Sequence, residues 1–160
     1  MQKITPFLWF DTQAEEAVNF YSSLFKDSKV GNASRYDEAG AAASGRPEGS
    51  VMTVSFQLNG QEFTAINGGP HFKFTEAISF VVNCENQEEV DYYWEKLSAV
   101  PQSEMCGWLK DKYGLSWQIV PTVLSKLLTD KDAKKSQRVM QAMLQMKKIE
   151  IADFEKAYKK

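Results

Sequence analysis

The sequence has few of the residues that define disulfide-rich and histidine-rich proteins. Cys84 and Cys106 are the only cysteines among 160 residues, and they form no CxxC motif. This number and spacing predict a reducing compartment, the cytoplasm. His71 is the only histidine. Because one histidine without a visible partner says little about chemistry, we expect His71 to be exposed or packed within its own loop.

Long apolar runs and basic tracts are also absent from the sequence. No apolar stretch approaches the ~18 residues that would suggest a membrane span. The opening MQKITPFLWFD has one lysine followed by a strand pattern, which is not typical of a signal peptide. Lysines and arginines number 19 against 21 aspartates and glutamates, without the clusters that bind phosphates. We therefore expect neither nucleic acid nor a membrane as a partner.

What the sequence does contain is an aromatic hairpin pattern, CGWLKDKYGLSWQIVP, over residues 106–121. It predicts a strand, a tight turn at 110–114 and a second strand that ends at its proline. The second strand alternates, with Leu115, Trp117 and Ile119 on one face and Ser116, Gln118 and Val120 on the other. We expect Trp117 to lie in the core.

Periodicity and turn residues predict the remaining elements. Strands are expected over 3–10, 29–37, 51–58, 61–67 and 76–83, and helices over 14–25, 87–98, 122–128, 132–146 and 149–160. Asn59-Gly60 predicts a hairpin turn. Capping boxes that pair Thr12 with Glu15 and Asn86 with Glu89 are expected to begin the first two helices. Residues 38–50 are Gly- and Ala-rich without periodicity, so we expect a loop there.

The two halves of the chain repeat one pattern. Val18 and Val90 are 72 residues apart, as are Tyr21 and Tyr93. Each half reads strand–helix–strand–strand–strand. A repeated unit that cannot bury its sheet face alone pairs with its copy.

The repeat predicts an α+β fold over residues 1–121. Modules 1–67 and 76–121 are expected to pair into a curved eight-stranded mixed sheet with a concave face. Residues 122–160 are expected to form a C-terminal helical tail that packs on this domain or across a dimer.

Three segments carry a resemblance to a known family: ITPFLWFDTQAEEAVNFYSSLF, NGQEFTAINGG and GWLKDKYGLSWQIVP. Over residues 3–121 the chain resembles the PhnB-like branch of the vicinal oxygen chelate superfamily. That superfamily includes glyoxalase I, bleomycin and fosfomycin resistance proteins and extradiol dioxygenases. The resemblance implies the glyoxalase-like fold and a homodimer. Members are often named 3-demethylubiquinone-9 3-methyltransferases, but the sequence has no Gly-rich GxGxG loop after a strand to hold the cofactor.

The resemblance also implies where a metal would bind. Metal-dependent members hold a divalent ion with His or Glu side chains from the first and last strand of each module. Those positions fall near Pro6 and Thr64 in the first module, and near Ile78 (or Ser79) and Gln118 in the second. None is a histidine, aspartate or glutamate, the side chains that replace the water shell of a divalent ion. We therefore expect no metal at the usual site and predict no cofactor.

We predict a small-molecule pocket on the concave face, lined by Leu8, Phe10, Thr64, Phe80, Trp108 and Gln118. Gln118 could hydrogen-bond a substrate there or satisfy a buried backbone group. Trp9 and Trp108 are open between pocket and core. Cys106 has no evident cationic neighbour to lower its pKa, so we expect an inert thiol.

Three interpretations of function follow. The first, which we favour, is a protein that binds or sequesters a small molecule and lacks the ancestral metal. The second is a divalent-metal-dependent lyase, transferase or dioxygenase with ligands elsewhere, such as His71, Glu62 or Glu76. The third is an assembly module whose methionine-rich helical face at 140–146 binds a partner. Packing of that face on its own domain explains it at least as well.

Overall fold

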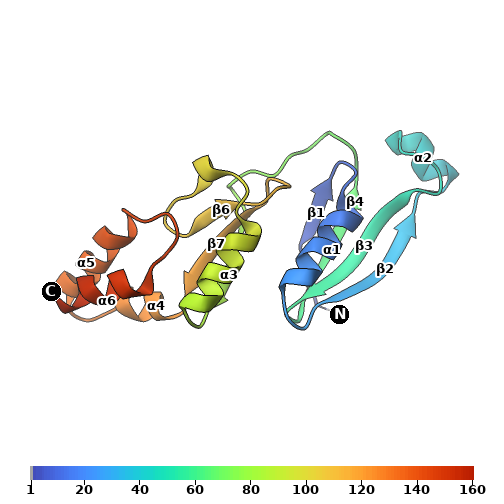
Figure 1. The fold of residues 1–160 in the computed structure, drawn as a ribbon. Coiled ribbons are helices and arrows are strands. Elements are labelled where there is room, and N and C mark those ends of the chain that lie inside the picture. Colours follow the sequence, from blue (N-terminus) through green and yellow to red (C-terminus); the bar gives the residue numbers. More distant parts are fainter. Residues whose placement is uncertain (1) are drawn as a thin grey trace. The chain divides into compact units, whose positions relative to one another are not determined.

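The protein consists of two compact units, Met1–Lys73 (unit 1) and Phe74–Lys160 (unit 2). The structure is a computed structural model, and it describes residues 2–160. Each unit is built on a small mixed sheet of its own, with a long helix against it (Figure 1). None of the helices within residues 2–160 combines the length and the hydropathy needed to cross a membrane.

Unit 1 follows the predicted order of elements, with one additional helix. Its elements are β1 (Phe7–Phe10), α1 (Ala14–Leu24), β2 (Lys29–Arg35), α2 (Glu38–Ser44), β3 (Val51–Leu58) and β4 (Gln61–Asn67). The sheet order is β1-β4-β3-β2, and β1 pairs with β4 in parallel. Asn59 and Gly60 form the predicted hairpin turn, with φ angles of 47° and 82°.

The helix α1 packs an apolar stripe on this sheet. Its buried residues are Ala14, Ala17, Val18, Tyr21 and Leu24. The strands contribute every second residue to the same core, such as Leu8 and its ladder partner Ala65. This alternation leaves one face of the sheet under α1 and the other face open.

The start of α1 differs from the prediction. Its N-cap is Gln13, which makes no side-chain capping bond to any described residue. The Oδ1 of Asn67 instead accepts the N–H of Ala14 at 2.8 Å. The predicted Thr12–Glu15 capping box is therefore wrong, because a buried residue at the far end of β4 caps the helix.

The stretch 38–50, predicted as a loop, contains the short helix α2. The Asp37 side chain caps it by accepting the N–H of Gly40 at 2.7 Å. Gly45 ends it in the left-handed conformation, with φ at 71°. All seven residues of α2 are exposed or half-buried, so the helix is held by its caps and its alanines rather than by a core.

Unit 2 has a three-stranded sheet with the order β5-β7-β6. Its elements are β5 (Ser79–Cys84), α3 (Gln87–Leu97), the 3-10 helix η1 (Pro101–Ser103), β6 (Trp108–Lys110), β7 (Ser116–Pro121), α4 (Val123–Leu128), α5 (Ala133–Met143) and α6 (Ile151–Lys159). The first strand again pairs in parallel with the last, β5 with β7, as β1 does with β4. The Asn86 side chain accepts the N–H of Glu89 at 3.0 Å, which confirms the predicted N-cap. The Glu89 carboxylate accepts the N–H of Glu85 at 2.8 Å rather than that of Asn86, so the reciprocal half of the predicted capping box is shifted by one residue.

Unit 2 departs from the predicted repeat by one strand. Where unit 1 has β2, residues 98–107 contain only η1 and a single bridge between Met105 and Trp108. The described residues thus form seven strands in two sheets rather than the expected eight. The loss has a local reason: Pro101 begins η1, and Cys106 and Gly107 both take positive φ angles that interrupt a strand.

The turn between β6 and β7 is built around a buried carboxylate, Asp111, which is 1% exposed. Its Oδ1 accepts the N–H groups of Tyr113 and Leu115 at 2.8 and 3.0 Å. Its Oδ2 accepts the indole N–H of Trp117 at 2.9 Å. Trp117 is 3% exposed, which confirms its predicted place in the core.

The tail helices form a small core of their own within unit 2. Its buried members are Leu124, Val139, Ile149 and Phe154. Arg138 of α5 donates to the carbonyls of Ala157 and Tyr158 at the end of α6, which closes the two helices on each other. The methionines at 143 and 146 pack against this core, while Met140 is 38% exposed.

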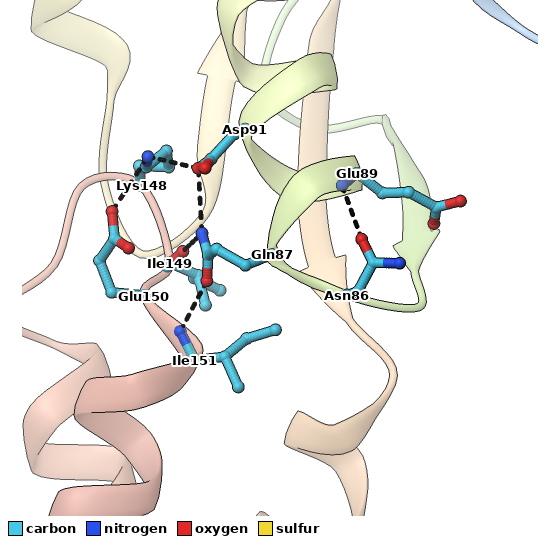
Figure 2. Close-up of polar contacts among 8 residues, drawn as sticks. All are labelled: Asn86, Gln87, Glu89, Asp91, Lys148, Ile149, Glu150 and Ile151. Carbon is cyan, nitrogen blue, oxygen red and sulfur yellow. Dashed lines mark hydrogen bonds and ion pairs between the residues drawn. The ribbon is translucent and has the colours of Figure 1, made fainter.

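The amide of Gln87 connects the tail to α3 (Figure 2). Its Nε2 donates to the carbonyl of Ile149 at 3.0 Å, and its Oε1 accepts the N–H of Ile151 at 2.9 Å. Lys148 forms ion pairs with Asp91 of α3 and, at 3.0 Å, with Glu150. The Lys148 hydrogen bond lowers the pKa of the Asp91 carboxyl and raises that of Lys148 itself. We call these contacts the tail latch.

Candidate functional site

One face of the unit 2 sheet is covered by α3 and the other is open. The covered face carries Leu109, Trp117 and Ile119, all at most 3% exposed. The ladders place Trp108 opposite Gln118 and Lys110 opposite Ser116 on the open face. The open face therefore presents an indole, an amide, an ammonium group and a hydroxyl.

A pocket of about 540 Å³ lies on this open face. It is lined by Glu76, Gln102, Ser103, Met105, Cys106, Trp108, Leu109, Lys110 and Ser116. Strand residues supply its floor, and the irregular segment that replaces the missing strand supplies a wall. All nine residues belong to unit 2, so we call it the unit 2 pocket.

Ser116 is the unusual member of the unit 2 pocket. The residue is 1% exposed, yet its hydroxyl has no hydrogen-bond partner among residues 2–160. A buried hydroxyl without a partner loses its hydrogen bonds to water and gains none in return, which costs about 1–3 kcal/mol. A ligand that reached Ser116 would remove that cost.

The charged groups of the pocket form a pair at its mouth. The Lys110 Nζ bonds the Glu76 carboxylate, which comes from the turn before β5. That hydrogen bond, with the charge of Lys110, holds the pKa of the Glu76 carboxyl below its usual value. The Lys110 side chain is 23% exposed and that of Glu76 is 60% exposed, so the ammonium lies further in.

The C-terminal tail braces the pocket wall through backbone hydrogen bonds. The N–H groups of Cys106 and Gly107 donate to the carbonyls of Met146 and Lys147 at 2.9 and 2.8 Å. A Cβ on Gly107 would lie 2.9 Å from the Ile149 side chain and 3.0 Å from the Ile119 carbonyl oxygen, so the wall packs closely at this glycine. The tail latch of Figure 2 therefore also holds the segment that lines the pocket.

The two cysteines differ in access. Cys84 is buried on the covered face, and burial raises the pKa of its thiol to about 12, so it is a poor nucleophile. Cys106 is half-buried and lines the pocket. Both thiols are free.

Unit 1 has a pocket of about 440 Å³ on the matching open face of its own sheet. It is lined by Thr5, Lys29, Gly31, Ser55, Phe56, Gln57, Glu62, Phe63 and Thr64. Here the Ser55 hydroxyl donates to the carbonyl of Asn32 at 3.2 Å. Its hydroxyl is thus already paired within the protein, unlike that of Ser116.

Comparisons with known proteins place the chain in a family. The model of the 3-demethylubiquinone-9 3-methyltransferase family matches residues 2–120. The chain belongs to this PhnB-like family. A PhnB protein from Bacillus cereus is 44% identical, with 76% of this chain and all of that chain covered, at a TM-score of 0.62. Among curated proteins, none matches.

Two further solved structures show how far the likeness extends. Protein PA1353 from Pseudomonas aeruginosa is 15% identical over 76% of this chain and 98% of its own, at a TM-score of 0.55. A glyoxylase/bleomycin resistance protein/dioxygenase domain from Frankia sp. EAN1pec is 14% identical over 76% and 92%, at a TM-score of 0.45. The first shares the fold, and the second likeness is too low to carry an argument. The predicted α+β class and the PhnB-like resemblance are confirmed.

Three of the predicted pocket residues of this PhnB-like chain lie under helices. Leu8 and Phe10 are 6% and 4% exposed on the face that α1 covers. Phe80 pairs with Trp117 on the covered face of unit 2, with ring centroids 5.6 Å apart. The alternation that turns these three side chains toward the covered faces points them away from the open faces.

The other three predicted residues lie on open faces. Thr64 lines the unit 1 pocket and Trp108 lines the unit 2 pocket. The Gln118 amide donates to the Ser79 hydroxyl at 2.9 Å, a side-chain partner that is neither the substrate nor the backbone group predicted for it. The six residues therefore do not all share one face.

The positions at which the resemblance implied a metal site come together in pairs. The N–H of Thr64 donates to the Pro6 carbonyl at 3.0 Å, and Gln118 bonds Ser79. Each pair offers neutral oxygen and nitrogen, not the carboxylate and imidazole donors that a divalent ion favours. The residues present thus do not fit a divalent ion at these positions. Across residues 2–160, no cluster of three or more His, Cys, Asp or Glu side chains is arranged to hold one.

Residues that the sequence did not single out carry most of the unit 2 pocket. Ser116 and Lys110 were visible only as members of an alternating strand and a turn. Strand alternation predicted that Ser116 lies on the same face as Gln118. It could not predict that the Ser116 hydroxyl has no hydrogen-bond partner. That property depends on the pocket wall, which is held by residues about thirty positions later in the chain.

Proposed function

We propose that this PhnB-like protein binds a small organic molecule in the unit 2 pocket, and that the molecule supplies the hydrogen bond that Ser116 lacks. The observation that carries the proposal is this buried, unpaired hydroxyl on the floor of a pocket of about 540 Å³. Trp108 and Met105 add apolar surface, as in most small-molecule sites. Family membership does not by itself assign the methyl transfer in the family's name to this chain.

The proposal includes no resident divalent metal at the usual position. Its support is the donor chemistry of Pro6, Thr64, Ser79 and Gln118. The alternative metal ligands His71, Glu62 and Glu76 do not belong to any cluster of three or more possible ligands among residues 2–160. Glu76 already pairs with Lys110. Metal analysis of purified protein tests this part, because stoichiometric zinc, nickel, manganese or iron would contradict it. The homodimer and the cytoplasmic location stay predictions.

The test is a thermal-shift screen of small aromatic and polar compounds on the full chain and on Ser116→Ala. We expect compounds that stabilise the wild type to stabilise Ser116→Ala less. Without ligand, Ser116→Ala should be as stable as the wild type or more stable by about 1 kcal/mol, because an unpaired buried hydroxyl is removed. A loss of binding with no loss of stability is the signature of a ligand contact.

Ser22→Ala is the matched control. Ser22 lies on α1, and its hydroxyl also has no partner among the described residues, but it lies outside both pockets. This variant should keep the full response to every compound. The proposal fails if Ser116→Ala binds as the wild type does, or if only metal ions stabilise the protein.

A further inference from the structure

The unit 2 pocket has one cation, Lys110, and the pocket's only carboxylate among the described residues, Glu76, is set against it. Lys110 lies on β6 directly opposite Ser116 in the ladder, so its ammonium and the unpaired hydroxyl are on the same face. Glu104, on the pocket wall, is engaged elsewhere: it accepts the Ser98 hydroxyl at 2.6 Å and pairs with Lys147 at 3.8 Å. Any anion that enters the pocket therefore competes with Glu76 alone.

The two partners of the pair are unequally exposed. Lys110 keeps 23% of its side chain exposed, whereas Glu76 keeps 60%. Glu76 lies in the turn before β5, outside any strand or helix. An ion pair with one partner this exposed contributes little to stability, because water solvates the carboxylate nearly as well when the pair is open.

A ligand carboxylate in the pocket would pair with Lys110 in a site from which water is more fully excluded than around Glu76. Its body would lie against Trp108 and Met105, which exclude water from that side. Charge-assisted hydrogen bonds are stronger where water is excluded. Exchange of Glu76 for a buried ligand anion therefore favours the bound state.

The remaining lining narrows the class of ligand. Trp108 is half-buried and offers indole surface to a flat apolar body, and Met105 is flexible enough to adapt to it. Ser116 can donate to or accept from one further polar group. A planar aromatic carboxylate presents these features together.

On the proposed function above, we infer that the unit 2 pocket selects planar aromatic anions, that Lys110 is their counter-ion, and that Glu76 is an internal competitor which the ligand displaces. The inference assigns opposite effects to two residues that touch each other. Loss of Lys110 weakens binding of the anion, and loss of the Glu76 charge strengthens it. A merely structural salt bridge would give the same sign for both.

The test compares naphthalene-2-carboxylate with naphthalene-2-carboxamide, which have nearly the same shape and differ in charge. Binding to the full chain is measured by calorimetry and by NMR shifts of the pocket residues. The wild type should bind the carboxylate about tenfold more tightly than the amide. Added salt should weaken only the carboxylate.

Variants test the predicted direction of each change in affinity. Glu76→Gln should tighten the carboxylate by about three- to tenfold and leave the amide unchanged. Lys110→Met should remove the preference between the two probes. Glu155→Gln, on the exposed face of α6, changes the net charge of the protein by the same amount and should change neither probe.

The outcomes separate this inference from the proposed function. Equal binding of carboxylate and amide, no binding of either, or weaker carboxylate binding by Glu76→Gln overturns the selection of anions. If compounds in the wider screen still depend on Ser116, the pocket remains a small-molecule site. If no compound depends on Ser116, both proposals fall together. Because Glu76→Gln alters an exposed side chain, its result stands even if Lys110→Met folds poorly.

Discussion

Units 1 and 2 share a parallel pair of first and last strands and a helix behind it, but they finish their sheets differently. Unit 1 adds β2 as a fourth strand, and the Ser55 hydroxyl on its open face is bonded within the protein. Unit 2 has η1 and an irregular segment instead, and there the Ser116 hydroxyl is left without a partner among the described residues. The departure from the repeat, rather than the repeat, provides the candidate site.

The tail explains why unit 2 can do without its fourth strand. A sheet edge leaves N–H and C=O groups that need partners. Near β6 these partners come from elsewhere: the N–H of Ala99 donates to the Lys110 carbonyl at 2.9 Å, and Met146 and Lys147 accept from Cys106 and Gly107. In unit 2 the tail thus replaces part of the bonding that a strand would give, and it leaves room for a pocket.

The largest effect is expected at the buried polar residue that organises each unit. Asp111→Ala in unit 2 leaves three N–H groups without their acceptor, so we expect the free energy of unfolding to fall by about 3–5 kcal/mol. Asn67→Ala in unit 1 removes the cap of α1 and its bonds to Glu15 and Val51, and should cost about 2–4 kcal/mol. Urea unfolding measures both.

Hydrogen exchange shows where each loss falls. We expect Asp111→Ala to expose amides of β6 and β7, and Asn67→Ala to expose those of α1. Asp111→Asn keeps one acceptor oxygen and should cost less than the alanine variant. Uniform exposure of both units by either substitution would mean that the two units do not each depend on their own buried residue.

Local features of the sequence predicted the fold well. The Asn59-Gly60 turn and the Asn86 N-cap involve residues within a few positions of each other, and both are confirmed. The helix α2 was missed, although Asp37 and Gly45 enclose an Ala-rich stretch in the positions that favour a cap at each end. There the absence of an apolar stripe concealed a helix that needs none.

Features that depend on distant residues were not predictable in this way. The cap of α1 comes from Asn67 at the end of β4, and no local pattern identifies it. Alternation sorted the residues of each strand into two faces, but it could not indicate which face of each sheet the helix covers. Leu8, Phe10 and Phe80 were consequently predicted to line a pocket that lies on the other side of the strands.

The contact between Gly107 and the tail should give the next largest effect. Gly107 and Gly114 have nearly the same positive φ, 84° and 85°, so alanine strains the backbone alike at both. A Cβ at Gly107 would meet Ile149 at 2.9 Å, while within residues 2–160 a Cβ at Gly114 has no neighbour inside 4 Å. Gly114→Ala should therefore cost about 1 kcal/mol and Gly107→Ala about 2–4 kcal/mol.

Chemical denaturation of these two variants sharpens the comparison of the units. The difference between them measures the close packing around Gly107, against Ile149 of the tail and the Ile119 carbonyl of β7, free of backbone strain. Gly107→Ala should also weaken compounds that bind the unit 2 pocket, whereas Gly114→Ala should not. Equal costs would show that the tail does not hold the wall.

A smaller effect is expected at the tail latch. Gln87→Ala removes both hydrogen bonds to the backbone of Ile149 and Ile151, and we expect a loss of about 1–2 kcal/mol. Asn86→Ala removes a cap from the same helix and should cost about 1 kcal/mol, without touching the tail. Hydrogen exchange separates them, since only Gln87→Ala should expose the amides of Cys106 and Gly107. Exposure by Asn86→Ala as well would indicate that α3, not the latch, holds the wall.

The smallest effect concerns the pair at the pocket mouth. The hydrogen bond and charge of Lys110 lower the pKa of the Glu76 carboxyl, so the ionised form is favoured in the folded state. This contribution to stability is complete above the unfolded pKa and is lost as the pH falls through the folded value. It should be small, because the carboxylate is exposed.

NMR titration of Lys110→Met should show the Glu76 pKa raised relative to the wild type. The Asp130 carboxyl, whose pKa is lowered mainly by the Tyr158 hydroxyl, should titrate as before. If the Glu76 pKa does not respond to the loss of Lys110, the pair is open in solution. Glu76 would then not compete with a ligand anion for the Lys110 ammonium.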